Sequence, residues 1–286
     1  STTGGAGRDD LLSGGHHDGE AGSAPGVEAG GRGARAAGIA ASLTTLAFGL
    51  HLAAVVTRGF ATGRAPWANM YEFVLATTLA ATGAYLVLLR RYDVRFLGVV
   101  TVPVVALGLG VALRSLYVPA DDVVPALDSY WIAIHVTAAI VASGLFLAGG
   151  GLLLLMLARE REERRALRGR PGRGRVAAWV SRLPSPARLD QLAYRVHTFV
   201  FPLWTFAVVS GAIWADDAWG RYWGWDPKEV WAFITWVSYA AHLHARALLG
   251  PRSRVAAVIA LVGFMTFLFN LFGVNIWFSG LHSYAF

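Results

Sequence analysis

Apolar and polar residues alternate in long blocks along this 286-residue chain, and the apolar blocks are long enough to cross a membrane. A membrane-crossing helix needs roughly 20 predominantly apolar residues. The third block contains Pro103, which predicts a kink or a tilt in that helix. The sequence therefore predicts a bundle of about seven transmembrane helices, near residues 37–57, 69–89, 96–113, 130–158, 195–215, 229–249 and 255–274.

Composition supports the same class. The chain is 55% hydrophobic and 15% charged, which is typical of an all-α integral membrane protein in contact with lipid. Residues 1–35 are Gly-rich and hold no apolar run, so we expect a disordered tail ahead of one membrane domain at 36–286. Cysteine is absent, which excludes disulfides, Cys-ligated zinc and iron–sulfur clusters within the chain.

Arginine is distributed unevenly among the connections. The segment 159–190 holds ten arginines, and the turns at 90–95 and 246–254 hold three each. These three connections share one side of the membrane if the helices alternate, and positively charged loops stay in the cytoplasm. We therefore expect 159–190 to be a cytoplasmic loop, with the N-terminus inside and the C-terminus outside. The net charge of +7 then reflects topology, and no nucleic-acid recognition motif accompanies it.

Tryptophan is concentrated in one short connection. The stretch Trp219–Trp236, WGRYWGWDPKEVWAFITW, contains five of the chain's 11 tryptophans, on and beside a predicted external loop at 214–231. Indole rings suit the membrane boundary because they combine an apolar body with one N–H donor. Five of them form a larger flat aromatic platform than anchoring requires. A planar hydrophobic ligand fits such a platform, and we interpret it as a haem platform.

Three histidines support this interpretation. An ionisable side chain in a membrane is costly, and neutral imidazole is a common haem ligand. His135 lies near the outer start of its helix and His282 follows the last span, so the two can face each other beside the Trp-rich loop. His244 lies 16 residues after Lys228, about 24 Å deeper along a helix, and needs a partner at its own depth.

The other histidines near the spans have ordinary explanations. His51 and His242 are expected to hydrogen-bond within helix packing, and His197 is expected at the cytoplasmic interface. His16 and His17 fall in the predicted tail.

Several short motifs follow one another in a fixed order along the chain. Trp219–Glu229, WGRYWGWDPKE, resembles the WWD signature of haem-handling proteins. The other motifs are Asn69–Glu72, Asp128–Val136, Leu189–Arg195, Phe201–Pro202, Gly211–Ala215, Leu243–Arg246 and Gly280–Tyr284. In this order they resemble the CcsA/ResC family of cytochrome c biogenesis proteins. This chain departs from many relatives at His242, where they have Tyr, and at Val200, where they have Gly.

The resemblance implies a function. It implies that His135 and His282 are axial ligands to the iron of haem b on the extracytoplasmic face of a bacterial plasma membrane. It implies that His244 ligates a second haem in the membrane, with the other ligand supplied by a CcsB/ResB-type partner. Haem would be the transported substrate, presented for thioether attachment to the Cys-x-x-Cys-His segment of an apocytochrome c. The chain would then be the haem-handling subunit of a System II haem lyase.

Further side chains are candidates for the haem site. Arg221 and Lys228 match the charge of haem propionates. Asp226 either belongs to the site or caps the helix that starts at Pro227. No residue is assigned a catalytic role. The residues expected to cover the macrocycle are Trp219, Trp223, Trp225 and Trp231.

Two other functions remain open from the sequence. One is a haem exporter or chaperone that performs no synthase chemistry. The other is a b-type membrane redox subunit, which should show two transmembrane histidine pairs, whereas one deep histidine is well supported here.

Overall fold

The computed structural model describes residues 25–119 and 129–282, and the described chain is helical without a strand. It separates into two compact units, residues 1–40 and 41–286. The described part of the first unit is the beginning of α1 (Pro25–Thr62). This helix starts within the segment expected to be a disordered tail, and residues 1–24 of that tail lie outside the described residues.

Six helical segments in the described ranges are long and apolar enough to cross a membrane, so the chain is an α-helical integral membrane protein. The last of them is continuous through three elements: α8 (Arg254–Leu268), a π-helical turn (Phe269–Gly273) and α9 (Val274–Trp277). Pro103 lies inside the third helix, as expected. The other five are α1, α2 (Met70–Arg91), α3 (Gly98–Ser115) with the short 3₁₀ turn Arg95–Leu97 before it, α4 (Tyr130–Leu167) and α6 (Pro186–Trp219).

The remaining expected span, 229–249, forms a helix that is not among these six segments. This helix, α7 (Pro227–Leu249), has 23 residues, which is long enough to cross a membrane. It packs against α8 and α6. Its buried face carries Tyr239, His242 and Arg246, and these polar side chains lower its hydropathy. Apolar side chains such as Val237 and Leu248 are exposed instead. Tyr239, His242 and Arg246 therefore face the interior of the bundle, and mean hydropathy along the helix does not show which face a polar residue occupies.

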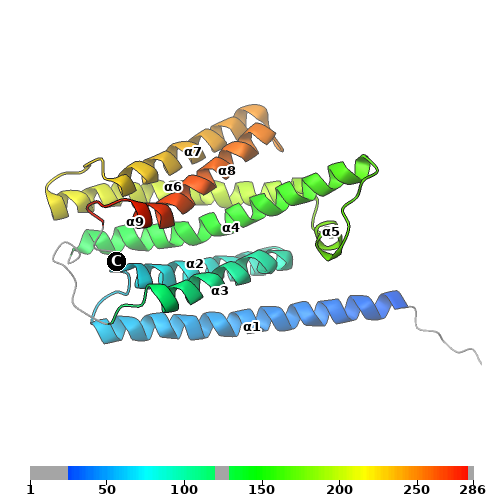
Figure 1. Ribbon diagram of the computed structural model, residues 1–286, viewed down its shortest axis with the longest axis horizontal. Coiled ribbons are helices and arrows are strands. Elements are labelled where there is room, and N and C mark those ends of the chain that lie inside the picture. Colours follow the sequence, from blue (N-terminus) through cyan, green and yellow to red (C-terminus); the bar gives the residue numbers. More distant parts are fainter. Residues whose placement is uncertain (1–24, 120–128, 283–286) are drawn as a thin grey trace, which may run out of the picture. The chain divides into compact units, whose positions relative to one another are not determined.

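The core of the second unit is built around the long α4–α6 pair (Figure 1). Glycines on α4 allow neighbouring helices to approach closely, as small residues commonly do in membranes. A Cβ on Gly144 would clash with the backbone of Ala80 and Ala81 in α2, and one on Gly150 would clash with the ring of Phe264 in α8. Phe146, which is fully buried, fills the space between these contacts and packs against α6, α7 and α8.

The helices from α2 to α8 alternate in direction, so their connections gather at two ends (Figure 1). One end holds the arginine-rich connections, including the segment 168–185 with the short helix α5 (Arg175–Val180). The other end holds the Trp-rich connection. Both predicted loops are shorter than expected: α6 continues to Trp219 and α7 begins at Pro227, while α4 extends to Leu167 and α6 starts at Pro186. The sidedness relative to the cytoplasm remains a prediction.

A buried charge cluster joins helices at the end of the bundle that holds the Trp-rich connection. Glu72, which is fully buried, accepts hydrogen bonds from Arg58 Nε at 2.9 Å and from Arg64 Nη1 at 2.7 Å. It also accepts the backbone N–H of Ala68 at 3.0 Å, and Asn69 caps α2 by accepting the N–H of Glu72. This cluster holds the segment before α2, which forms one wall of the site described next.

Candidate functional site

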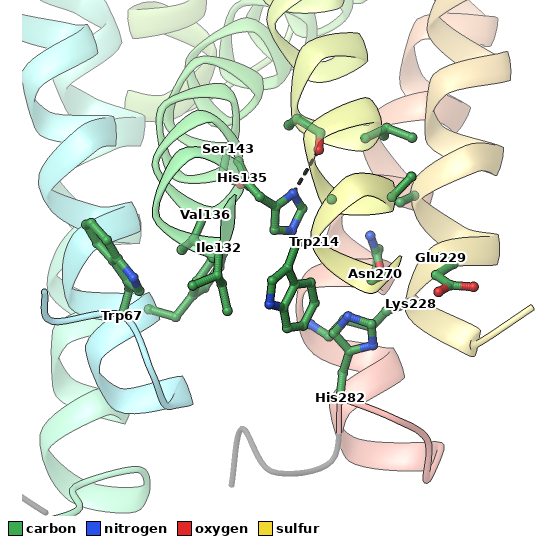
Figure 2. A pocket seen from close by; sticks show the side chains of 18 of the residues that line it. Trp67, Ile132, His135, Val136, Ser143, Trp214, Lys228, Glu229, Asn270 and His282 are labelled. Atoms are coloured by element: carbon green, nitrogen blue, oxygen red, sulfur yellow. Dashed lines mark hydrogen bonds between the residues drawn. The ribbon is translucent and has the colours of Figure 1, made fainter. Parts of the chain in front are cut away.

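A cavity of about 180 Å³ lies where α4, α6 and α7 meet the start of α2 and the C-terminal segment. Its lining combines aromatic rings with two imidazoles, one ammonium group, one carboxylate and two amides, which is the mixture expected of a site for a large, partly polar ligand. Ten of the side chains around it are labelled in Figure 2. The lining includes Trp67, Asn69, Met70, Phe73, His135, Trp204, Trp214, Trp219, Trp223, Lys228, Glu229, Asn270 and His282.

His135 is held on the first turns of α4. Ser129 caps this helix by accepting the backbone N–H of Trp131 at 3.2 Å. The His135 Nδ1–H donates to the carbonyl oxygen of Ala207 on α6 at 2.8 Å, which leaves the imidazole lone pair on Nε2. Gly211 allows this approach, because a Cβ there would lie 2.7 Å from the His135 ring. The ring is therefore fixed by α6 as well as by its own helix.

His282 is held by Asp226, the capping residue of α7. The His282 Nδ1 lies 2.8 Å from Asp226 Oδ1, and the backbone N–H of Leu281 donates to Asp226 Oδ2 at 2.6 Å. Asp226 also caps α7 through the N–H of Lys228, and Glu229 completes a capping box, so the predicted cap is confirmed. Burial raises the pKa of Asp226, but the hydrogen bonds from His282, Lys228 and Leu281 outweigh it and hold that pKa below its usual value.

Trp214 lies between the two imidazoles (Figure 2). Its ring is parallel to the His135 ring with centroids 6.1 Å apart, and its centroid lies 5.9 Å from that of His282. Trp219 contacts both Trp214 and His282. The two histidines predicted to face each other thus line one cavity, from elements 147 positions apart in the sequence, with a buried indole between them.

Only part of the predicted aromatic platform lines the cavity. Trp219 and Trp223 line it, and so does Lys228. Trp225 does not line it and is 76% exposed, with its ring edge-on to that of Trp223 at a centroid distance of 6.0 Å. Trp231 packs against Phe269 instead, with ring centroids 4.3 Å apart.

Two further predicted site residues lie beside the cavity without lining it. Arg221 is exposed on the loop, with its guanidinium over Gly224. Asp226 lies behind His282 rather than in the cavity wall.

Sequence reasoning missed several residues of the wall. Trp214 and Trp204 lie inside α6, where an isolated Trp is indistinguishable from a packing residue. Asn270 could have been predicted as a site residue, because an amide in an otherwise apolar stretch is costly in a membrane. Its Oδ1 has no hydrogen-bond partner among the described residues, and the residue lines the cavity. Met70, on the opposite wall, accepts a hydrogen bond from Asn275.

His244 is separate from this cavity. It is exposed on the outer surface of α7 and does not line the pocket. His242 is buried on the opposite face and donates from Nδ1 to the Ala256 carbonyl at 2.8 Å, as its predicted packing role requires. His197 is also fully buried and contacts His242, with nitrogens 3.3 Å apart. His197 therefore lies inside the bundle with the His242 imidazole as its polar partner, and its depth near the cytoplasmic interface stays a prediction.

Comparison with known proteins gives the family. The model of the cytochrome c assembly protein family matches residues 67–282, which include every residue that lines the cavity. The chain belongs to the cytochrome c assembly family. It is 35% identical to the cytochrome c biogenesis protein CcsA of Synechococcus sp. (strain CC9605) over 268 residues, covering 87% of each chain.

Other relatives agree. The CcsA proteins of Synechocystis sp. (strain ATCC 27184 / PCC 6803 / Kazusa) and of Porphyra purpurea are 34% and 33% identical to this chain. These alignments cover 78% of this chain and 80% of the first relative, and 86% of this chain and of the second. The expected CcsA/ResC membership is confirmed, and it gives the chain a role in cytochrome c maturation.

Proposed function

We propose that this chain binds haem b between His135 and His282 and presents it for covalent attachment to an apocytochrome c. The observation that carries this proposal is the pair of imidazoles on one aromatic cavity, each with Nδ1 hydrogen-bonded to a fixed acceptor. This tautomer places the lone pair of each ring on Nε2, the usual iron-binding atom in such an arrangement. Haem here is the substrate, and this chain's residues position it.

The cavity fits haem chemically, although it must widen. Its volume of about 180 Å³ is below the roughly 300–1,000 Å³ typical of ligand sites. Trp214 occupies the space between the imidazoles, so we expect its ring to move when both histidines bind one iron. Lys228 supplies a cation for a propionate, and Trp223 supplies a flat wall. A macrocycle that only partly enters would leave a vinyl edge accessible to a thiol.

The proposed reaction adds two cysteine thiols of a Cys-x-x-Cys-His segment across the two vinyl groups. Each addition forms one C–S bond, and the thiol proton ends on the neighbouring vinyl carbon, so no oxidant is needed. The chain contributes mainly by holding the iron and the ring in one orientation. Arginine asymmetry supports an extracytoplasmic site in a bacterial plasma membrane, with the basic connections in the cytoplasm.

The position of His244 supports a second proposal, which concerns another haem and a partner protein. The His244 imidazole lies on the exposed face of α7, where it would meet lipid or a neighbouring protein. A polar side chain facing lipid alone would be unfavourable. We propose that a CcsB/ResB-type membrane protein covers this face and supplies the other axial ligand to a haem within the membrane.

The test uses the complex purified from a host lacking other cytochrome c synthases. His135→Ala and His282→Ala should each abolish maturation and change the haem absorption spectrum while the protein still inserts. Trp223→Ala should weaken haem retention more than Trp225→Ala, because Trp223 lines the cavity and Trp225 does not. Normal maturation with either histidine variant would overturn the proposed ligand pair. Haem bound without any cytochrome product would favour the exporter or chaperone function instead.

A further inference from the structure

Asp226 makes more contacts than a helix cap requires. An N-cap side chain needs one acceptor for a backbone N–H at the start of its helix. Asp226 satisfies this with Oδ1, which accepts the N–H of Lys228 at 3.0 Å. The same carboxylate also binds His282 Nδ1 at 2.8 Å and the N–H of Leu281 at 2.6 Å. The carboxylate is buried, and a Cβ on Gly280 would overlap its Oδ2.

The donor pattern around Asp226 requires a carboxylate. Three N–H groups, from Lys228, Leu281 and the His282 ring, point to its two oxygens. Asparagine would direct its amide NH₂ against one of these donors, and serine is too short to reach them all. Serine nevertheless remains a good N-cap. Capping and binding of the His282 segment are therefore separable by substitution.

The two imidazoles of the cavity differ in their second partner. His135 donates to a neutral backbone carbonyl, that of Ala207, whereas His282 donates to the Asp226 carboxylate. A carboxylate partner fixes the ring orientation and the tautomer and makes the other ring nitrogen a stronger donor to a metal. The pair is thus asymmetric although both members are histidines.

We propose that Asp226 is a positioning residue for His282, which orients that imidazole toward the haem iron and makes it the stronger of the two axial donors. This inference rests on the proposed function. Asp226 acts through His282 and does not touch haem itself. The Asp of the Trp-rich motif therefore connects the loop to the C-terminal segment, and it sets the electronic properties of the site as well as its geometry.

The experiment compares Asp226→Ser, which keeps a capping oxygen, with Ser253→Ala, which removes the cap of α8 through Ala256. Three quantities are measured on the purified complex: thermal unfolding without haem, haem affinity by absorption titration, and the haem midpoint potential. Asp226→Ser should keep the α7 cap and stay folded, bind haem 10–100-fold more weakly and have a more positive potential, because a weaker donor stabilises ferric iron less. Ser253→Ala should change unfolding alone.

Two further measurements keep the inference separate from the proposed function. In a His282→Ala background, Asp226→Ser should cause no additional loss of haem affinity, since its effect passes through His282. In the haem-free protein, ¹⁵N NMR of labelled histidine should show His282 protonated at Nδ1, and Asp226→Ser should remove that preference. Unchanged affinity, potential and tautomer in Asp226→Ser would overturn the inference. If His282→Ala leaves haem binding intact, the proposed function fails, whereas the tautomer measurement still decides the role of Asp226.

Discussion

A single methyl group added at Gly211 should displace His135. The Gly211 Cα faces the imidazole across the α4–α6 contact, and an added Cβ would lie 2.7 Å from both Cε1 and Nδ1 of His135. Non-bonded carbon atoms are at their optimum about 3.5–4.0 Å apart, so the ring must retreat by roughly 0.8 Å or more. Ala207 lies on α6 together with Gly211, so a retreat of the ring from α6 lengthens and weakens its 2.8 Å hydrogen bond to the Ala207 carbonyl.

The expected magnitude follows from three effects. Loss of a buried hydrogen bond costs about 1–3 kcal/mol, and overpacking costs a similar amount. Replacing Gly by Ala within a helix stabilises the protein by about 0.5–1 kcal/mol, which offsets part of this loss. Gly211→Ala should therefore destabilise the haem-free protein by about 1–5 kcal/mol. Haem affinity should fall about 10–100-fold, the usual consequence of releasing a ligating imidazole from its hydrogen-bond partner.

Gly110→Ala is the matched control. Gly110 is also in a membrane helix, α3, and a Cβ there would meet nothing within 4 Å. This variant should be at least as stable as the native protein and should bind haem equally well. Both are measured in detergent, by thermal unfolding and by absorption titration with haem. If Gly211→Ala behaves like Gly110→Ala in both assays, the packing of His135 against α6 does not orient the ligand.

Two further predictions separate buried from exposed groups. Glu72→Gln should cost about 3–5 kcal/mol of stability, because it leaves two guanidinium groups with a neutral partner in a buried site. Glu160→Gln, which affects two partly exposed ion pairs, should cost about 0–1 kcal/mol, and equal melting temperatures of the two variants would contradict this. His244→Ala should leave the melting temperature of the isolated chain almost unchanged but lower the haem content of the two-protein complex, while His242→Ala should lower the melting temperature. An unstable His244→Ala chain would show that His244 is packed inside this protein instead.

The membrane helices could be predicted because lipid imposes one requirement along the chain. Every crossing helix must present apolar side chains outward, so continuous apolar blocks mark most of them. The same requirement explains why α7 is marked less clearly. Its polar residues Tyr239, His242 and Arg246 are buried against α6 and α8, and Arg246 pairs there with Asp190 at 2.5 Å. A composition window averages both faces and cannot distinguish inward from outward polarity.

The sequence could not predict which tryptophans of the Trp-rich loop line the cavity, because this depends on the backbone torsions of the loop. The motif predicted one platform, but Trp223 lines the cavity and Trp225 does not. Trp225 has a positive φ of 58°, and Glu229 stabilises this turn by accepting the N–H groups of Gly224 and Asp226. Tryptophan count alone cannot supply that torsion. The depth argument for His135 and His282 succeeded because it needed only the positions of both residues relative to helix ends.

The contact between His197 and His242 could not be predicted, because a single sequence does not show which distant residues pair. His197 and His242 are 45 positions apart, and each alone reads as a costly polar residue in an apolar helix. One hydrogen bond joins them: His242 donates from Nδ1 to the Ala256 carbonyl, so its Nε2 accepts the proton of His197 Nδ1, while His197 Nε2 has no hydrogen-bond partner among the described residues. Once His242 has this partner on the inner face, helical geometry places His244, two residues later, on the opposite face. The exposure of His244 is thus a consequence of the internal pair, and it leaves that imidazole available to a neighbouring chain.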